Sequence, residues 1–230
     1  GRITKLSYPA NEARIDYGYK EGNNISIFYD SMVAKVISKS DSRKKAIELM
    51  INYLKKIDIR GVDTNLNFLI DIYNSEAFVK GEINTNFIDQ KYRYGYTGAI
   101  ENQSQVFKIS LLAFSNKINY LISVNKNIKN ISKSWIIKVE ENQLSVNILN
   151  ISENNFKLRI DNKIFVLKFD VSSNFIKLTD SNEKDFALGR VFDMQNYLRV
   201  NYNGKIAKVT ILNKATYELF KKLPIKTKDD

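Results

Sequence analysis

The sequence of 230 residues lacks cysteine and histidine altogether, and it contains only two prolines. The chain therefore cannot supply a disulfide, a thiolate nucleophile, a Ser-His-Asp triad or an ordinary zinc site. Long apolar runs are absent as well, because none approaches the roughly 18 residues that a membrane-spanning helix needs. These absences predict a soluble protein whose acid–base or metal chemistry would depend on carboxylates, lysine or tyrosine.

The beginning of the sequence has no initiator methionine and no charge-then-apolar signal pattern, and a strand-like run starts at once at Gly1. We therefore expect the interior of a longer chain. The hydrophobic content of 43% and the charged content of 27% are typical of globular proteins. The length suffices for two small domains, each with its own core.

Positive charge is in excess, with a net charge of +11. Most of the excess lies in residues 99–230, which hold 21 Lys and Arg against 13 Asp and Glu. These cations mostly alternate with apolar residues, which is typical of the solvated face of a sheet. Because no Lys/Arg cluster or RNA-binding signature is present, a nucleic-acid site is the less favoured interpretation.

The first part of the sequence predicts a small antiparallel sheet covered by two helices. Alternating residues predict strands over 1–6, 13–18, 25–29 and 32–37. Asp41 is expected to cap a helix, and Asp63 or Thr64 a second one. Gly61 lies where the backbone must turn sharply between them. The apolar residues of the first helix recur at intervals of three or four: Ala46, Ile47, Met50, Leu54 and Ile57.

Two short motifs flank the first of these helices. Tyr29–Lys35 reads YDSMVAK and Gly61–Asn65 reads GVDTN. In this order and spacing they resemble the C-terminal subdomain of biotin carboxylase, the ATP-grasp half of biotin-dependent acyl-CoA carboxylases. Phe78–Ile88 also matches the closing motif of that family, F-x-x-G-x-x-x-T-x-[FY]-[IL]. The resemblance covers residues 1–93 and implies an ATP-dependent ligase.

The resemblance implies a catalytic and biotin-binding role for Arg14. In the family, an arginine just before the Tyr-Asp motif meets the ureido oxygen of biotin while the ring is deprotonated and carboxylated. A guanidinium suits this role because it stabilises negative charge without losing its own proton. The alternative is an exposed strand arginine paired with Glu12 or Asp16.

The remaining polar residues of this part are interpreted structurally. Asp30 and Lys35 stand in an apolar run, which predicts a buried mutual ion pair or a role at an interface. Arg43, Thr64 and Asn65 are interpreted as caps and turn residues. The parent enzyme would use biotin, ATP and Mg, but the sequence has no phosphate-binding glycine loop and no metal site is expected. We therefore expect this chain alone to be catalytically incomplete.

The second part predicts a long helix enclosed by a barrel. Residues Glu101–Ile118 are apolar around almost the whole helix, so that helix must be enclosed. Asp161-Asn162 and Asn203-Gly204 are hairpin turns. Eight strands at this spacing predict a meandering antiparallel barrel, whose closure removes free edges. The expected strands are 135–139, 144–151, 156–160, 164–169, 175–178, 186–192, 197–202 and 206–212.

This order of elements resembles the BT domain of propionyl-CoA carboxylase-type α subunits, which joins the biotin carboxylase to the carboxyltransferase β subunit. The fold class is thus α+β, with domains at 1–93 and 94–225. The implied partners are the β subunit and the rest of the α subunit, including its biotinyl domain, with no nucleic acid or membrane. The implied location is a bacterial cytoplasm or the mitochondrial matrix of a eukaryote.

The Asn- and Lys-rich segment Asn119–Lys133 is expected to be either an exposed docking loop for the β subunit or an ordinary connection. The rival hypothesis for the whole chain is a free-standing basic barrel that binds single-stranded nucleic acid. In that case Tyr197 and Tyr202 would stack on bases. Steep salt dependence of single-strand binding would distinguish the rival from the scaffold.

Overall fold

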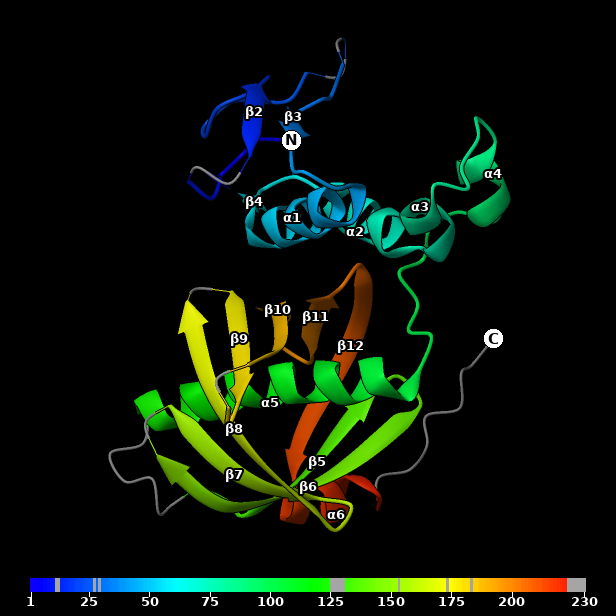
Figure 1. Cartoon of the computed structure of the whole chain (residues 1–230). Helices are drawn as coiled ribbons and strands as arrows, with labels where there is room; N and C mark the ends of the chain where they lie inside the picture. The colour runs from blue at the N-terminus through cyan, green and yellow to red at the C-terminus, as the bar shows by residue number, and fades with distance from the viewer. Residues whose placement is uncertain are drawn as a thin grey trace, which may run out of the picture. The chain divides into compact units, whose positions relative to one another are not determined.

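The structure is a computed structural model that describes residues 1–10, 13–26, 28, 30–124, 131–152, 154–172, 174–182 and 184–222. The chain divides into two compact units (Figure 1). The first comprises Gly1–Gly98 together with Asn203–Lys205, and the second comprises Ala99–Tyr202 together with Ile206–Asp230. Each unit is described separately below.

The first unit contains two small antiparallel sheets where a single sheet was predicted. Strand β1 (Lys5–Ser7) pairs with β4 (Asp58–Arg60), and β2 (Arg14–Tyr17) pairs with β3 (Ala34–Ile37). The strand predicted over 25–29 is wrong for the residues described there. Ile25 and the turn before it instead bond irregularly to the N-terminal segment, since Ile25 N donates to the Gly1 carbonyl and Gly22 N donates to the Ile3 carbonyl.

The two predicted helices of this unit are confirmed as α1 (Arg43–Lys56) and α2 (Leu66–Asn74), and the short helices α3 (Glu76–Lys80) and α4 (Phe87–Lys91) follow. Ser42 caps α1 in place of the predicted Asp41, because its side chain accepts a hydrogen bond from Lys45 N. The predicted cap of α2 at Asp63 or Thr64 is wrong, because Asn65 occupies the cap position, without a side-chain cap bond. The apolar stripe of α1 packs against α2 in one core, which includes Ile47, Met50, Ile51, Leu54, Leu66 and Ile70.

Gly61 connects β4 to the turn before α2, and its φ of 87° lies in the left-handed region. A Cβ atom at this position would lie 2.2 Å from the Arg2 carbonyl oxygen and 2.9 Å from Thr4. Only glycine lets the backbone turn here while the N-terminal segment packs so closely. The sharp turn predicted at Gly61 is therefore confirmed.

A buried ion pair also lies in the first unit. Lys205 Nζ is 2.6 Å from Asp71 Oδ1, and the two side chains are 6% and 10% exposed. The hydroxyl group of Tyr92 donates to the other Asp71 oxygen at 2.8 Å. Both carboxylate oxygens of Asp71 are thus paired, as a buried charge requires.

The second unit is a long helix, α5 (Gln103–Val124), inside a closed antiparallel barrel of the strands β5 to β12 (Figure 1). Each strand pairs with its sequence neighbour, and β12 closes the barrel against β5. The predicted barrel and its enclosed helix are confirmed. The strands are β5 (Ser134–Val139), β6 (Asn142–Ser152), β7 (Asn155–Ile160), β8 (Lys163–Ser172), β9 (Phe175–Asp180), β10 (Asp185–Asp193), β11 (Leu198–Tyr202) and β12 (Lys205–Asn213).

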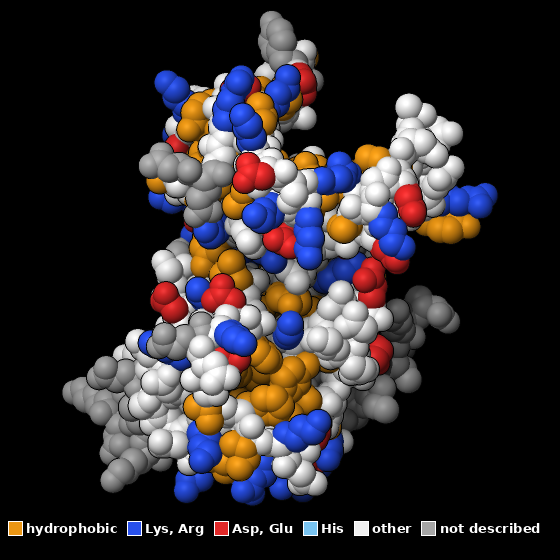
Figure 2. Space-filling view, viewed as in Figure 1, with side chains coloured by type: hydrophobic (Ala, Val, Ile, Leu, Met, Phe, Trp, Pro, Cys, Tyr) orange, Lys and Arg blue, Asp and Glu red, His pale blue; other side chains and the backbone are white. Residues whose placement is uncertain are grey.

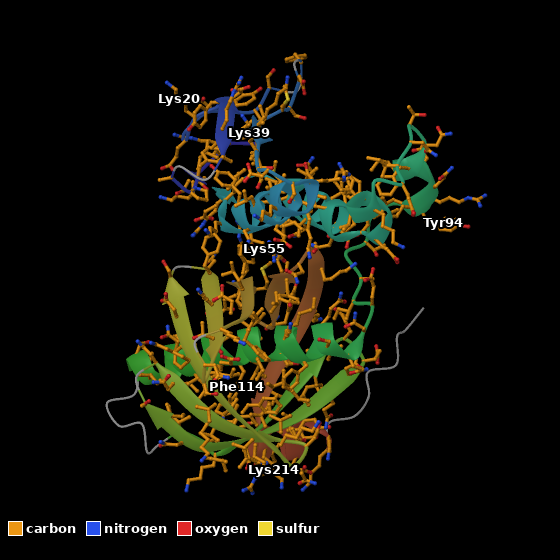
Figure 3. All side chains as sticks on the ribbon, in the orientation of Figure 1. Lys20, Lys39, Lys55, Tyr94, Phe114 and Lys214 are labelled. Atoms are coloured by element: carbon orange, nitrogen blue, oxygen red, sulfur yellow. The ribbon has the colours of Figure 1, made fainter. Side chains whose placement is uncertain are left out.

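The core of the second unit forms between α5 and the barrel wall. Phe114 lies fully buried on α5 (Figure 3). Its ring contacts those of Trp135 and Phe156 edge to face. A Cβ atom on Gly189 of β10 would lie 2.6 Å from Leu112 Cδ1. The missing side chain thus lets the helix approach the wall.

The two predicted hairpin turns are confirmed, because both central residues of Asp161-Asn162 and of Asn203-Gly204 have positive φ. Asn213, the last residue of β12, caps the short helix α6 (Lys214–Phe220) by accepting a hydrogen bond from Thr216 N. In the described part of the chain, no helix combines the length and hydropathy that crossing a bilayer would take.

Candidate functional site

The candidate site is the exposed face of the β2–β3 hairpin. Arg14 is paired in register with Ile37, and Asp16 with Lys35. Residues paired across an antiparallel ladder point to the same side, so these four side chains share one face. The opposite face carries Ile15 and Val36, which are partly buried against the helical core. Burial of that face directs Arg14 toward solvent.

Arg14 forms a two-pronged ion pair with Asp16. The Nε and Nη2 atoms of Arg14 each donate to one oxygen of Asp16 at 3.0 Å. The two side chains are 72% and 45% exposed. The Asp16 partner that the alternative interpretation predicted is therefore present, whereas Glu12 lies outside the described residues. In the part of the chain that the structure describes, Nη1 of Arg14 has no bonding partner.

The electrostatics of this pair keep both groups charged. The hydrogen bond from Arg14 lowers the pKa of Asp16, and the positive charges of Arg14 and Lys35 add to this shift. The same hydrogen bond raises the pKa of Arg14. The two hydrogen bonds to Asp16 also restrict the rotation of the guanidinium, so the side that carries Nη1 keeps a defined direction. Three N–H groups of the guanidinium remain, two on Nη1 and one on Nη2, and they can donate to an anionic oxygen.

The predicted buried ion pair between Asp30 and Lys35 is wrong, because both side chains are exposed. Asp30 Oδ1 accepts a hydrogen bond from Met32 N at 3.1 Å and closes a local turn. Strand alternation places Lys35 on the solvent face, across from Asp16. Its positive charge therefore contributes to lowering the pKa of Asp16, a role that sequence reasoning missed because it depends on the register of β2 against β3.

Arg43 does more than the predicted turn or cap role. Its Nη2 donates to the Phe78 carbonyl at 2.7 Å, and its guanidinium lies 5.1 Å from the centre of the Phe78 ring. Arg43 thereby joins the start of α1 to α3. Thr64 is exposed.

The predicted docking segment Asn119–Lys133 is in part helical. Helix α5 continues beyond Ile118 to Val124, because the sequence there contains no glycine or proline to end it. Tyr120 and Val124 are 57% and 61% exposed at this end of the helix. Residues 125–130 lie outside the described residues, and Ile131 is buried in the barrel core.

The first unit matches a known protein family in sequence. Residues 1–90 match the family model of the biotin carboxylase C-terminal domain. The chain is also similar in sequence to the alpha chains of biotin-dependent carboxylases.

Among these relatives, the human propionyl-CoA carboxylase alpha chain, mitochondrial, is 33% identical over 120 residues, which are 51% of this chain and 16% of the relative. Its counterpart from Caenorhabditis elegans is 24% identical over 255 aligned residues, covering 100% of this chain and 35% of the relative. The alpha subunit of methylcrotonoyl-CoA carboxylase from Glycine max is 36% identical over 90 residues, 39% of this chain and 12% of the relative. The aligned part of the chain thus covers 16% or less of the human and Glycine max relatives and 35% of the Caenorhabditis elegans relative.

Two solved structures are also similar. The biotin carboxylase domain of Hydrogenobacter thermophilus 2-oxoglutarate carboxylase aligns with a TM-score of 0.39 at 26% identity, covering 42% of this chain and 22% of that one. Kluyveromyces lactis urea carboxylase aligns with a TM-score of 0.38 at 20% identity, covering 91% of this chain and 18% of that one.

Proposed function

We propose that this chain is part of the alpha subunit of a biotin-dependent acyl-CoA carboxylase of the propionyl-CoA/acetyl-CoA type. Residues 1–93 complete its biotin carboxylase domain, and residues 94–225 form the BT scaffold that docks the carboxyltransferase β subunit. One observation carries the proposal. A biotin carboxylase C-terminal domain is followed directly by a helix enclosed in a closed barrel, and the Caenorhabditis elegans alignment runs through both.

Arg14 is the residue of this chain that we assign to biotin. Its Nη1 has no partner in the described residues, while the Asp16 fork holds the rest of the guanidinium. This arrangement fits a single charge-assisted hydrogen bond to the ureido oxygen. Biotin would supply the nitrogen that carries the carboxyl group. Arg14 would hold and orient the ring and favour the negatively charged oxygen.

ATP and magnesium do not fit the residues present. In the described ranges, no group of three or more carboxylates lies close enough to hold a metal ion. The sequence also has no glycine-rich phosphate loop. We therefore assign no ATP or metal ligand to this chain.

The exposed end of α5 supports the docking part of the proposal. Tyr120 and Val124 present apolar surface to solvent at the point where the predicted docking segment begins. Large apolar side chains exposed together at one site are typical of a surface that a partner covers. The end of α5 and the connection that follows it are thus our proposed contact with the β subunit.

Deleting residues 126–130 tests this contact. Co-purification with the β subunit should weaken, and the melting temperature should stay nearly unchanged, because the barrel and its core are left intact. The control replaces the same five residues with Gly and Ser at equal length, which keeps the connection but removes its side chains. Unchanged co-purification together with a lowered melting temperature would show that the segment is structural.

The rival nucleic-acid function finds no support in the geometry of its two tyrosines. Tyr202 is 6% exposed within the barrel core and offers no ring face to a base. Tyr197 is half-buried, and the Lys208 ammonium lies 4.7 Å from the centre of its ring.

A further inference from the structure

The outer surface of the barrel exposes three aliphatic side chains on β6 and β8. Leu149 is 40% exposed, Ile164 53% and Val166 46%. The outer face of an antiparallel sheet is ordinarily polar, because the apolar residues alternate inward. Along β8 the inward positions are already occupied by Leu167 and Phe169, which are almost fully buried. The three exposed residues therefore add nothing to the core.

Three cations surround these aliphatic residues. Lys157 is paired in register with Val166, and Arg159 with Ile164, so each cation shares the outward side with its apolar partner. Lys168 follows Val166 on the same side of β8 and is also exposed. We call these six residues the basic face: Leu149, Lys157, Arg159, Ile164, Val166 and Lys168.

One negative charge lies close to the basic face, because the exposed Asp170 follows Lys168 on the outward side of β8. In the described part of the molecule, Lys157, Arg159 and Lys168 form no ion pair, whereas Lys177 on β9 is paired with Asp185 at 2.7 Å. Figure 2 shows that, on the visible side of this unit, hydrophobic side chains also reach the surface with Lys and Arg around them. A positive rim around exposed apolar atoms is complementary to a negative surface that also carries apolar groups.

The barrel geometry restricts how a partner can bind. Because each strand is already paired on both sides, the basic face has no free backbone edge that could accept an added strand. Recognition must therefore come from side chains. Lys157 and Arg159 are two residues apart on one strand, a spacing of roughly 6.5–7 Å, which neighbouring carboxylates on one face of a helix or strand can match.

The chemistry of the face favours protein over nucleic acid. Single-stranded nucleic acid is held by aromatic rings on which bases stack. The nearby rings of Phe156 and Phe169 are buried inside the barrel, and the apolar residues of the face are all aliphatic. Aliphatic side chains pack well against other aliphatic side chains, but a nucleic-acid base cannot stack on them as it does on an aromatic ring.

We propose that the basic face binds an acidic protein segment that presents aliphatic side chains on the same side as its carboxylates. This inference does not depend on the carboxylase assignment. It concerns the wall of the barrel, whereas the proposed β-subunit contact lies at the end of α5.

A photo-crosslinking amino acid at position 166, in the whole chain expressed in cells, tests the inference. The same amino acid at Ser145, an exposed residue on the outward side of β6, serves as the control. We expect a protein adduct specific to position 166, with the linked peptide carrying two or more Asp or Glu within about one helical turn. No specific adduct, an adduct to nucleic acid, or a linked segment without acidic residues would overturn the inference.

A binding measurement then separates charge from apolar contact. The linked segment is synthesised as a peptide, and its affinity for the chain is measured by titration. Arg159→Glu should weaken binding by about tenfold or more, since it replaces attraction with repulsion, and Ile164→Ser should weaken it several-fold. Affinity should also fall with added salt. Equal affinity for the parent chain and Arg159→Glu would contradict the proposal, and circular dichroism of both variants checks that they fold.

Discussion

Among single residues, Asp16 gives the most direct test of the ion pair with Arg14, because its pKa depends on that pair. The hydrogen bond from Arg14 lowers the pKa of Asp16 below its ordinary value of 3.8. A lowered folded-state pKa means that the stabilising effect of the pair is fully present above the unfolded pKa and is lost as the pH falls through the folded pKa.

An NMR titration of the Asp16 carboxyl group measures this shift. We expect its midpoint below 3.8 in the parent chain and a clear rise in Arg14→Gln. Lys35→Gln should produce a smaller rise, because Lys35 acts only through its charge and at greater distance. A titration that does not respond to Arg14→Gln would show that the fork does not form in solution.

Gly61 illustrates a residue whose role could be predicted from sequence, although the strength of the constraint could not. Gly61→Ala should lower the free energy of unfolding by roughly 2–5 kcal/mol, about 1–2 for the left-handed backbone and about 1–3 for overpacking against Arg2. Gly95→Ala is the matched control, because Gly95 also has a positive φ but no neighbouring atom within 4 Å of the added Cβ. Urea denaturation measures both, and equal losses would mean that the close contact with Arg2 contributes nothing.

Among the elements, α5 carries the core of the second unit. Phe114→Ala should lower the free energy of unfolding by about 3–5 kcal/mol, because it removes a fully buried ring that touches two others. Tyr120→Ala, on the exposed end of the same helix, should change it by less than about 0.5 kcal/mol. Denaturation followed by circular dichroism compares the two, and a small loss for Phe114→Ala would contradict the enclosed position of the helix.

The elements show where sequence reasoning succeeds. The barrel strands were predictable because inward residues such as Phe156 and Leu158 alternate strictly with polar ones, and because the hairpin turns carry residues suited to positive φ. The small sheets of the first unit were less predictable from the sequence. Segment 20–25 bonds the N-terminal residues through its backbone, and a backbone pairing of this kind leaves little trace in side-chain alternation.

The candidate site was predictable only in part. Arg14 was found through the resemblance, and its pairing with Asp16 follows from two charges that alternate on one strand. Lys35 was misjudged because a cation in an apolar run looks buried until the strand is paired with its neighbour. The register of β2 against β3, which sequence spacing alone does not determine, decides that Lys35 faces Asp16.

For the whole molecule, the central claim is that this chain completes a biotin carboxylase and that Arg14 acts on biotin. The most direct measurement is the rate at which the complete product of the same gene carboxylates free biotin with ATP, magnesium and labelled bicarbonate. We predict ATP-dependent carboxylation by the parent protein and a loss on the order of a hundredfold or more in Arg14→Ala, without a change in melting temperature.

The comparison with Arg14→Lys completes the test, because a lysine ammonium cannot reproduce the planar fork on Asp16 and should restore the rate only in part. No ATP-dependent carboxylation by the parent protein would contradict the assignment of the whole chain. A normal rate together with a lowered melting temperature in Arg14→Ala would contradict the role of Arg14 alone.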